Sequence, residues 1–466
     1  MRYHTGLGLA LFMLAQAATG GENQESLRVI VKSTPQAMNL MTRPALEKQF
    51  NIHISTMTPI AGGAYVIVVN KPKALDGQKA MTALLKQLNN SQEFAYAVED
   101  RKGHFKPVPQ PQSVKDMKDA IELSHYLQWD EFIAPAGVML ESAAGRRDGA
   151  WMYTTGEATE PVVVAVLDTG IATNPAIYDN LVKDENGKLW GWNFAANNRD
   201  IYDETGSYHG THVSGTIAGF SREMTGIGQN LKVLPVKIPD ASGMFYESQV
   251  INGIYWSVGG KVPAVPDNIY PAKVLNMSFG VDERPGKEKE ICDPALQDAV
   301  DYARAQGAVL MAAAGNDNRY QHFNAPAACE RVMVVAATGP EGLRSYYSNY
   351  GPGVSFAAPG GDLRYGKVGG ILSTVNEYGG YNHSGFDFYQ GTSMATPHAA
   401  GIAGLIYAIT NNQITPEQVE QLMLNSVHPF GESSDPDKSC KGRKSCGKGI
   451  LDADKAVRTA LSGAWK

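Results

Sequence analysis

The chain has 466 residues, which is long for one average domain and fits a large domain with a smaller one. Hydrophobic residues make up 43% and charged residues 19%, so the chain can bury a sizeable core. The formal net charge is −6 and no long basic run is present, which gives no electrostatic reason to expect a nucleic-acid partner.

The first residues have the pattern of an export signal. Arg2 precedes an apolar run from Leu7 to Leu14, and Ala15-Gln16-Ala17 provides a small-x-small cleavage site. The run is too short to span a bilayer, and no later stretch of the sequence approaches eighteen uninterrupted apolar residues. We therefore expect residues 1–17 to be a signal peptide of a secreted protein that has no membrane contact after cleavage. An uncleaved anchor or a buried first helix is the alternative.

A small α+β domain is predicted next, over residues 18–110. The apolar pattern predicts strands over 27–31, 52–60, 64–69 and 94–98, and helices over 35–50 and 76–88. This β-α-β-β-α-β order is that of a ferredoxin-like domain. The proline-dense stretch from Lys106 to Gln112 cannot continue a helix or a strand, and it predicts an extended linker that a protease could cut. The residues alone leave open whether the domain is a stable binding module.

Strands alternate with helices beyond residue 150. Strands are predicted over 161–168, 231–238, 273–277 and 308–314, and helices over 248–256, 294–305, 399–409, 417–424 and 453–461. This alternation indicates a mostly parallel sheet that is covered by helices on both faces.

Three polar residues stand at the ends of these elements. Asp168 ends a β-branched run, where the catalytic groups of open α/β sheets gather. His209 opens a helix of small residues. Ser393 comes before an apolar helical run, where free backbone N–H groups would stabilise an anion. Each also has an ordinary structural interpretation, as a helix cap or a packed imidazole. Together they supply an acid, a base and a nucleophile in the order Asp, His, Ser.

The motifs around these residues resemble those of subtilisin-like serine proteases, which have this order. The motifs are Asp168-Thr169-Gly170, His209-Gly210-Thr211-His212-Val213, Asn276-Met277-Ser278-Phe279-Gly280, Ala313-Ala314-Gly315-Asn316 and Gly391-Thr392-Ser393-Met394-Ala395. The resemblance covers roughly residues 151–457, with a weaker match before them. It implies a secreted bacterial serine endopeptidase with a subtilisin-like three-layer α/β fold over residues 111–466.

The resemblance also implies a role for each motif. Asp168, His209 and Ser393 would be the catalytic triad, and Asn316 would stabilise the oxyanion. Two edges of small or apolar residues would form the pocket for the residue before the cut bond, namely Ser278, Phe279 and Gly280 on one side and Ala313, Ala314 and Gly315 on the other. These edges are uncharged, so we expect a broad preference for apolar residues. Asp282 and Glu283 lie just beyond and could instead favour basic side chains.

The resemblance also implies a role for the small domain. In precursors of the resembled family, a domain of this shape assists folding and blocks the active site with its C-terminal tail. We therefore expect residues 18–110 to be a prodomain and an intramolecular inhibitor, and the chain to be a self-processing zymogen. The mature N-terminus is expected between Phe105 and Lys115. We expect a monomer that acts on polypeptides.

Four cysteines in an exported chain favour disulfides, and three pairings are open. We expect Cys292 with Cys329 and Cys440 with Cys446, because each pair brackets a surface loop in its own region. The segment around Cys440 lacks a second metal-type cysteine pair, so zinc is not expected. The chemistry implies no cofactor. Structural calcium is common in the resembled family, but the segment 220–225 departs from the family's loop and puts that site in doubt, so metal ligands are left unassigned.

Three other classes fit less well. A zinc protease would need H-E-x-x-H, which the histidines 209 and 212 do not provide, and an aspartic protease would need a second Asp-Thr-Gly or Asp-Ser-Gly. An α/β-hydrolase would need the order Ser, acid, His, with enough chain after Ser393 for the sheet. A binding protein on an inactive protease fold is disfavoured because all the catalytic residue types are present.

Overall fold

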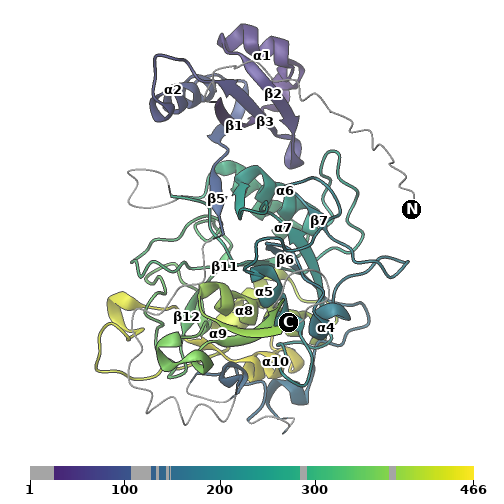
Figure 1. Ribbon diagram of the computed structural model, residues 1–466, viewed down its shortest axis with the longest axis vertical. Coiled ribbons are helices and arrows are strands. Elements are labelled where there is room, and N and C mark those ends of the chain that lie inside the picture. The colour runs from purple at the N-terminus through teal and green to yellow at the C-terminus, as the bar shows by residue number, and fades with distance from the viewer. Residues whose placement is uncertain are drawn as a thin grey trace, which may run out of the picture.

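The computed structural model describes residues 26–105, 127–132, 136–142, 146, 148–283, 291–376 and 385–465. The expected signal peptide and the expected proline-dense linker lie outside these residues. Figure 1 shows a small N-terminal domain, in purple, above a larger domain coloured from teal to yellow. Within the described ranges, no helix combines the length and the apolar character that a bilayer crossing requires.

The small domain has the expected β-α-β-β-α-β order. Its 4-stranded antiparallel sheet has the order β2-β3-β1-β4, with the strands β1 (Ser26–Ser33), β2 (Ile54–Pro59), β3 (Tyr65–Asn70) and β4 (Phe94–Glu99). The helix expected over 35–50 is wrong as a single element, because a 3-10 turn over Pro35–Leu40 comes before α1 (Arg43–Phe50). Pro44 lies in the first turn of α1, where proline is tolerated, so α1 starts anew there. The second helix is α2 (Gly77–Asn89).

A 9-stranded sheet with the order β16-β17-β13-β12-β11-β10-β6-β8-β7 forms the centre of the large domain. Its strands are β6 (Val163–Asp168), β7 (Trp192–Asn193), β8 (Lys232–Lys237), β10 (Val274–Met277), β11 (Val309–Ala313), β12 (Met333–Thr338), β13 (Phe356–Pro359), β16 (Val427–His428) and β17 (Ile450–Leu451). Neighbouring strands are parallel except β16 and β17, so the expected mostly parallel sheet is confirmed.

Helices cover this sheet on both faces. They are α4 (Pro175–Tyr178), α5 (His209–Ala218), α6 (Glu247–Ser257), α7 (Pro294–Ala305), α8 (Thr392–Ile409), α9 (Pro416–Asn425) and α10 (Ala453–Leu461). Val164 and Val166 of β6 share one core with α5 and α8, whereas Ala165 and Leu167 share the other with α6 and α7. Because successive strand residues point to opposite faces, a strand buried on both sides must be apolar throughout. The expected subtilisin-like layers are therefore present.

The small domain docks on the large one through the second face of its own sheet. Val29 and Ile67 pack with α1 and α2, whereas Ile30 and Val66 alternate with them and belong to the core that includes α6 and α7. Figure 1 shows the small sheet above α6 and α7. One apolar face of the small sheet thus forms the core of the small domain, and the other face forms the interface with the large domain.

Two antiparallel strand pairs lie outside the main sheets. The pair β14 (Ile371–Val375) and β15 (Gly385–Tyr389) packs beside α5. In the other pair, β5 (Lys102–His104) runs antiparallel to β9 (Met244–Tyr246), so the tail of the small domain lies along the large one. The sequence patterns predicted neither β5 nor β9.

Two disulfides are present, Cys292–Cys329 and Cys440–Cys446, which is the expected pairing. The first joins the segment before α7 to the segment before β12, and the second closes a loop of sequence separation 6 near the C-terminus.

Candidate active site

Asp168 and His209 meet at the carboxyl end of the central sheet. Asp168 is the last residue of β6, and His209 is the first residue of α5. The Nδ1 of His209 lies 2.7 Å from Asp168 Oδ1, and both residues are buried. A carboxylate only accepts hydrogen bonds, so Nδ1 carries the proton and Nε2 is left as an acceptor. The backbone N–H of Thr169 also donates to Asp168 Oδ1, at 2.7 Å, which fixes the carboxylate.

Opposed influences act on the imidazole. Burial disfavours the charged ring and would lower the pKa of His209. The charge and the hydrogen bond of Asp168, together with the charge of Asp203, exceed this influence, so the pKa lies above its ordinary value. His212 lies in the same helix, and there the influence of burial exceeds the opposing charge of Asp387. Burial lowers the pKa of His212 to about 3, and its ring stacks on Tyr389. The absence of a catalytic assignment for His212 agrees with these surroundings.

Ser393 is held at the start of α8. The helix begins at Thr392 and its N-cap is Gly391, so the interpretation of Ser393 as the N-cap is wrong. The φ of Gly391 is 152°, which glycine tolerates better than other residues. Ser393 Oγ donates to the Ser278 carbonyl at 2.9 Å, and Ser278 Oγ donates to the Ser393 carbonyl at 3.0 Å. This reciprocal pair joins the nucleophile candidate to one predicted pocket edge.

Asn316 lies just after β11 and is oriented by the residue before Ser393. Its Oδ1 accepts from the Thr392 N–H at 2.8 Å and from the Thr392 hydroxyl at 2.9 Å. With the oxygen engaged in this way, the amide NH₂ is the donor end of the side chain. Asn316, His209 and Ser393 line one cavity.

The two predicted pocket edges border the same cavity. All six of their residues line it, from Ser278 to Gly280 on one side and from Ala313 to Gly315 on the other. Ser278, Phe279, Ala313 and Ala314 are buried. The segments that the motifs singled out are thus brought together from distant parts of the chain.

The tail of the small domain enters this cavity. Phe105 contacts the His209 ring, with centroids 5.6 Å apart, and the rings of Phe245 and Phe279 at 5.7 and 5.3 Å. Its N–H donates to the Gly243 carbonyl at 2.9 Å. Sequence analysis assigned Phe105 no role beyond marking one limit of the expected mature N-terminus. An aromatic residue directly before a proline-dense stretch is the signal that could have indicated it.

Asp203 and Thr169 also belong to the surroundings of His209, and the motifs did not assign them. The Thr169 hydroxyl donates to Asp203 Oδ2 and accepts from the Gly210 N–H at 2.8 Å. Thr169 therefore joins the end of β6 to the first turn of α5. Asp203 lies in an irregular loop before His209, where no periodic pattern marks it.

The residues after α5 form a short turn that is closed by its own contacts. Phe220 pairs with Thr225 in a β-bridge, Ser221 bonds back to Met224, and the carboxylate of Glu223 is exposed. Among the residues that the structure describes, no group of three or more His, Cys, Asp or Glu side chains is placed to hold a metal. Metal ligands therefore stay unassigned.

Comparisons with known proteins agree with this geometry. Residues 159–452 match the subtilase family of peptidases. An extracellular protease of Xanthomonas campestris pv. campestris is 34% identical over 339 residues, which is 67% of this chain and 53% of the relative. An extracellular basic protease of Dichelobacter nodosus is 32% identical over 340 residues, covering 66% of this chain and 52% of the relative. The chain thus spans about half the length of these curated relatives.

Solved protease structures also match this chain. A protease structure from Pseudoalteromonas arctica is 32% identical with a TM-score of 0.60, and the match covers 72% of this chain and 97% of that one. Fervidolysin from Fervidobacterium pennivorans, a keratinolytic enzyme related to subtilisin, is 22% identical with a TM-score of 0.63, covering 93% of this chain and 61% of that one, and this likeness bears on the fold alone. On its family match and its relatives, this chain belongs to the subtilase family.

Proposed function

We propose that this protein is a secreted serine endopeptidase that cuts polypeptides through an acyl-enzyme. The observation that carries the proposal is the hydrogen bond between Asp168 and His209 on a cavity that also holds Ser393 and Asn316. Serine is a poor nucleophile at neutral pH unless a base accepts its proton, and neutral His209 is such a base. The relatives named extracellular proteases support both the reaction and the location.

The reaction follows from these contacts. The Ser393 hydroxyl turns from the Ser278 carbonyl to His209 Nε2, gives up its proton and attacks the substrate carbonyl carbon. Asp168 stabilises the imidazolium that forms, and the Asn316 amide and the Ser393 N–H donate to the oxyanion. His209 then protonates the leaving amine, and water releases the acyl group by the reverse steps.

We propose that uncharged walls select the residue before the cut bond. The six edge residues carry no charge, so binding comes from apolar burial at roughly 25 cal/mol per Å², and large apolar residues are preferred broadly. Substrate profiling that finds cleavage almost only after Lys or Arg would contradict this pocket.

The proposal includes a zymogen. Residues 18–110 act as an inhibitory prodomain and residues 111–466 as the peptidase, with the signal peptide removed first. Supporting this, β5 lies on the large domain and Phe105 covers His209, where a substrate would have to bind. The mature enzyme is a monomer. The chemistry needs no cofactor, and any calcium that binds acts on stability.

A serine-directed phosphonate probe tests the function. The Ser393 oxygen should displace the leaving group of the probe, so the secreted mature protein should gain the mass of one phosphonyl group. The label should map to Ser393, and casein hydrolysis should be lost. Protein denatured before the reaction is the control and should remain unlabelled, because the probe requires the assembled base. An active preparation that resists the probe, or a label on another serine, would contradict the proposal.

A further inference from the structure

The tail of the small domain runs from Arg101 to Phe105 as an extended strand on the large domain. The Glu247 N–H donates to the Arg101 carbonyl at 2.8 Å, and the Phe105 N–H donates to the Gly243 carbonyl at 2.9 Å, with the β5–β9 pairing between them. On the other side, the Asp282 N–H donates to the Lys102 carbonyl at 2.9 Å. These are main-chain bonds, so another extended peptide can make them whatever its side chains.

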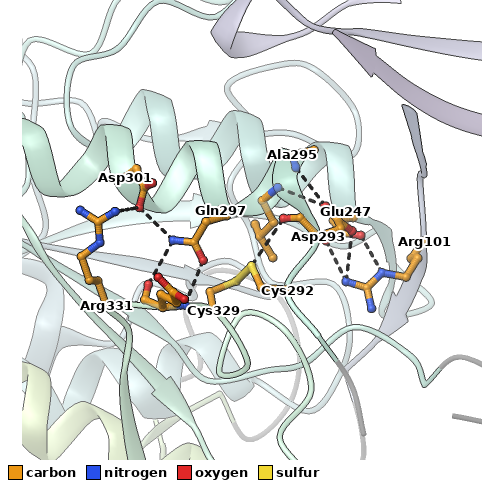
Figure 2. Close-up of a disulfide and its surroundings, with 11 residues drawn as sticks. Arg101, Glu247, Cys292, Asp293, Ala295, Gln297, Asp301, Cys329 and Arg331 are labelled. Carbon is orange, nitrogen blue, oxygen red and sulfur yellow. Dashed lines mark hydrogen bonds and ion pairs between the residues drawn. A yellow bond between two sulfur atoms is a disulfide. The ribbon is translucent and has the colours of Figure 1, made fainter. Parts of the chain in front are cut away.

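Arg101 inserts a buried guanidinium into the large domain at the far end of this strand. Its Nε lies 2.8 Å from Glu247 Oε2 and its Nη2 lies 3.0 Å from Glu247 Oε1, a two-point contact. Nη2 also lies 3.4 Å from Asp293 Oδ2. The arginine and aspartate side chains are 3% and 4% exposed and the glutamate is fully buried. Figure 2 shows both carboxylates facing the guanidinium.

Both carboxylates lie at the N-termini of helices of the large domain. Glu247 is the first residue of α6. Asp293 caps α7 by accepting from the Ala295 and Leu296 N–H groups, and it follows Cys292, which the disulfide ties to Cys329 (Figure 2). The position of Asp293 therefore depends on the framework of the large domain. At Glu247, removal of the small domain takes away the guanidinium and also the hydrogen bond from the Glu247 N–H to the Arg101 carbonyl.

A positive partner favours the ionised form of these two neighbouring carboxylates. Burial, and next the charge of Asp293, raise the pKa of Glu247 to about 8 even beside Arg101. The charge of Arg101 opposes this rise and favours the ionised form of Glu247. Once Arg101 has left, the guanidinium of a substrate arginine in the same position would again favour the ionised form of Glu247.

We propose that Glu247 and Asp293 form a substrate subsite for an arginine side chain, four residues before the position that Phe105 occupies. A planar guanidinium matches a two-point carboxylate contact better than an ammonium, so arginine is favoured over lysine. The inference rests on the proposed endopeptidase function and adds to it a recognition site distant from the cut bond. Substrates would be extended segments with arginine in that register.

Internally quenched peptides test the subsite on the mature wild-type enzyme. They carry Arg, Lys, citrulline or Ala followed by the constant segment Lys-Gly-His-Phe and a constant apolar stretch. The glycine is retained because a Cβ at Gly103 would lie 2.2 Å from Phe245 Cζ. Citrulline keeps the shape of arginine but has no charge. The arginine peptide should have a kcat/KM at least about ten-fold above that of the citrulline peptide, with lysine between them, since hydrogen bonds to charged groups are the stronger ones. Mass spectrometry locates the cut and verifies the register.

Variants assign the effect to the carboxylates. Glu247→Gln or Asp293→Asn should reduce the ratio of kcat/KM for the arginine peptide to kcat/KM for the citrulline peptide towards one. Asp282→Asn is the matched control, because that carboxylate pairs with His104 and lies on the other side of the strand. In the Asp282→Asn variant, the arginine-to-citrulline ratio of kcat/KM should remain high. If a variant does not fold from its own precursor, the wild-type peptide series still decides.

The outcomes separate the two proposals. Equal cleavage of the arginine and citrulline peptides, or lysine equal to arginine, overturns the subsite and leaves the endopeptidase function standing. Failure to cut any peptide or casein, together with failure of the phosphonate to react, overturns the endopeptidase function and the subsite with it.

Discussion

His209 determines how the activity should depend on pH. A protonated ring cannot accept the proton of Ser393, so activity must fall as the pH drops through its pKa. Asp168 and Asp203 raise that pKa above the ordinary 6.5 despite burial. We expect kcat/KM to fall on the acid side through a single ionisation above pH 6.5 and to hold on the alkaline side. A profile of kcat/KM against pH measures this, and a maximum near pH 4 would show that His209 is not the base.

Asp203 gives a second prediction at this scale. Its charge favours the imidazolium of His209, so Asp203→Asn should move the acid limb of the profile to lower pH. The loss of the charge should have this effect even where the hydrogen bond from Thr169 survives. Asp200→Asn removes the same charge from an exposed position of the same loop, and it should move the limb less. Equal shifts in the two variants would contradict a specific effect of Asp203.

Residues with a chemical motif could be predicted from the sequence, whereas their supporting contacts could not. The motifs around Asp168, His209, Ser393 and Asn316 predicted roles for these residues through their resemblance to subtilisin-like proteases, and the roles stay predictions. Asp203 lies in an irregular loop. Arg101 and Glu247 are 146 positions apart, so no local pattern could link them. Contacts of this kind exist only after the chain has folded.

Long elements with a clear period were predicted well, and short ones were not. The bounds of α7 and α10 agree with the expected 294–305 and 453–461. The strands β5 and β9 span three residues each, too few for a period, and main-chain bonds to a distant partner hold them. In β5, Gly103 lies so close to the Phe245 ring that a side chain would not fit there. Because glycine has no side chain, this position adds nothing to the apolar pattern that would predict a strand.

The disulfides give a prediction for the elements that they join. Cys292–Cys329 has a sequence separation of 37 and Cys440–Cys446 one of 6. The chain-entropy estimate is about 4 kcal/mol for the longer loop and about 2 kcal/mol for the shorter. We expect Cys292→Ser with Cys329→Ser to lower the free energy of unfolding more than the matched pair Cys440→Ser with Cys446→Ser. Denaturant unfolding of the mature enzyme measures both, and the reverse order would contradict the loop argument.

At the scale of the whole molecule, the interface between the two domains combines apolar packing with contacts at the active-site cavity. The small sheet is apolar on both faces, and the face that bears Ile30 and Val66 is covered by the large domain. A free binding module would expose that face to water, and contiguous exposed apolar surface of this kind is unusual on monomeric proteins. The extended tail then places Phe105 over His209. These contacts favour a prodomain over the stable binding module that the residues alone left open.

A Ser393→Ala chain tests this organisation as a whole. If the enzyme cuts its own linker after Phe105, removal of the hydroxyl removes the nucleophile, and the secreted protein should keep its small domain covalently attached. The fold should survive, because the change deletes one hydrogen bond to Ser278, worth about 1 kcal/mol. Ser462→Ala, at an exposed serine after α10, is the matched control and should mature normally. Intact-mass analysis in a host without other extracellular proteases gives the length of each product.

Addition of mature wild-type enzyme completes the test. The Ser393→Ala precursor should then be cut in the linker, because only its nucleophile is missing and the linker remains a substrate in trans. Cleavage by added enzyme, together with no cleavage alone, would establish that maturation depends on Ser393 and that the variant is folded well enough to be processed. A Ser393→Ala chain that matures alone at the same bond and degrades casein would overturn both the nucleophile and the self-processing zymogen.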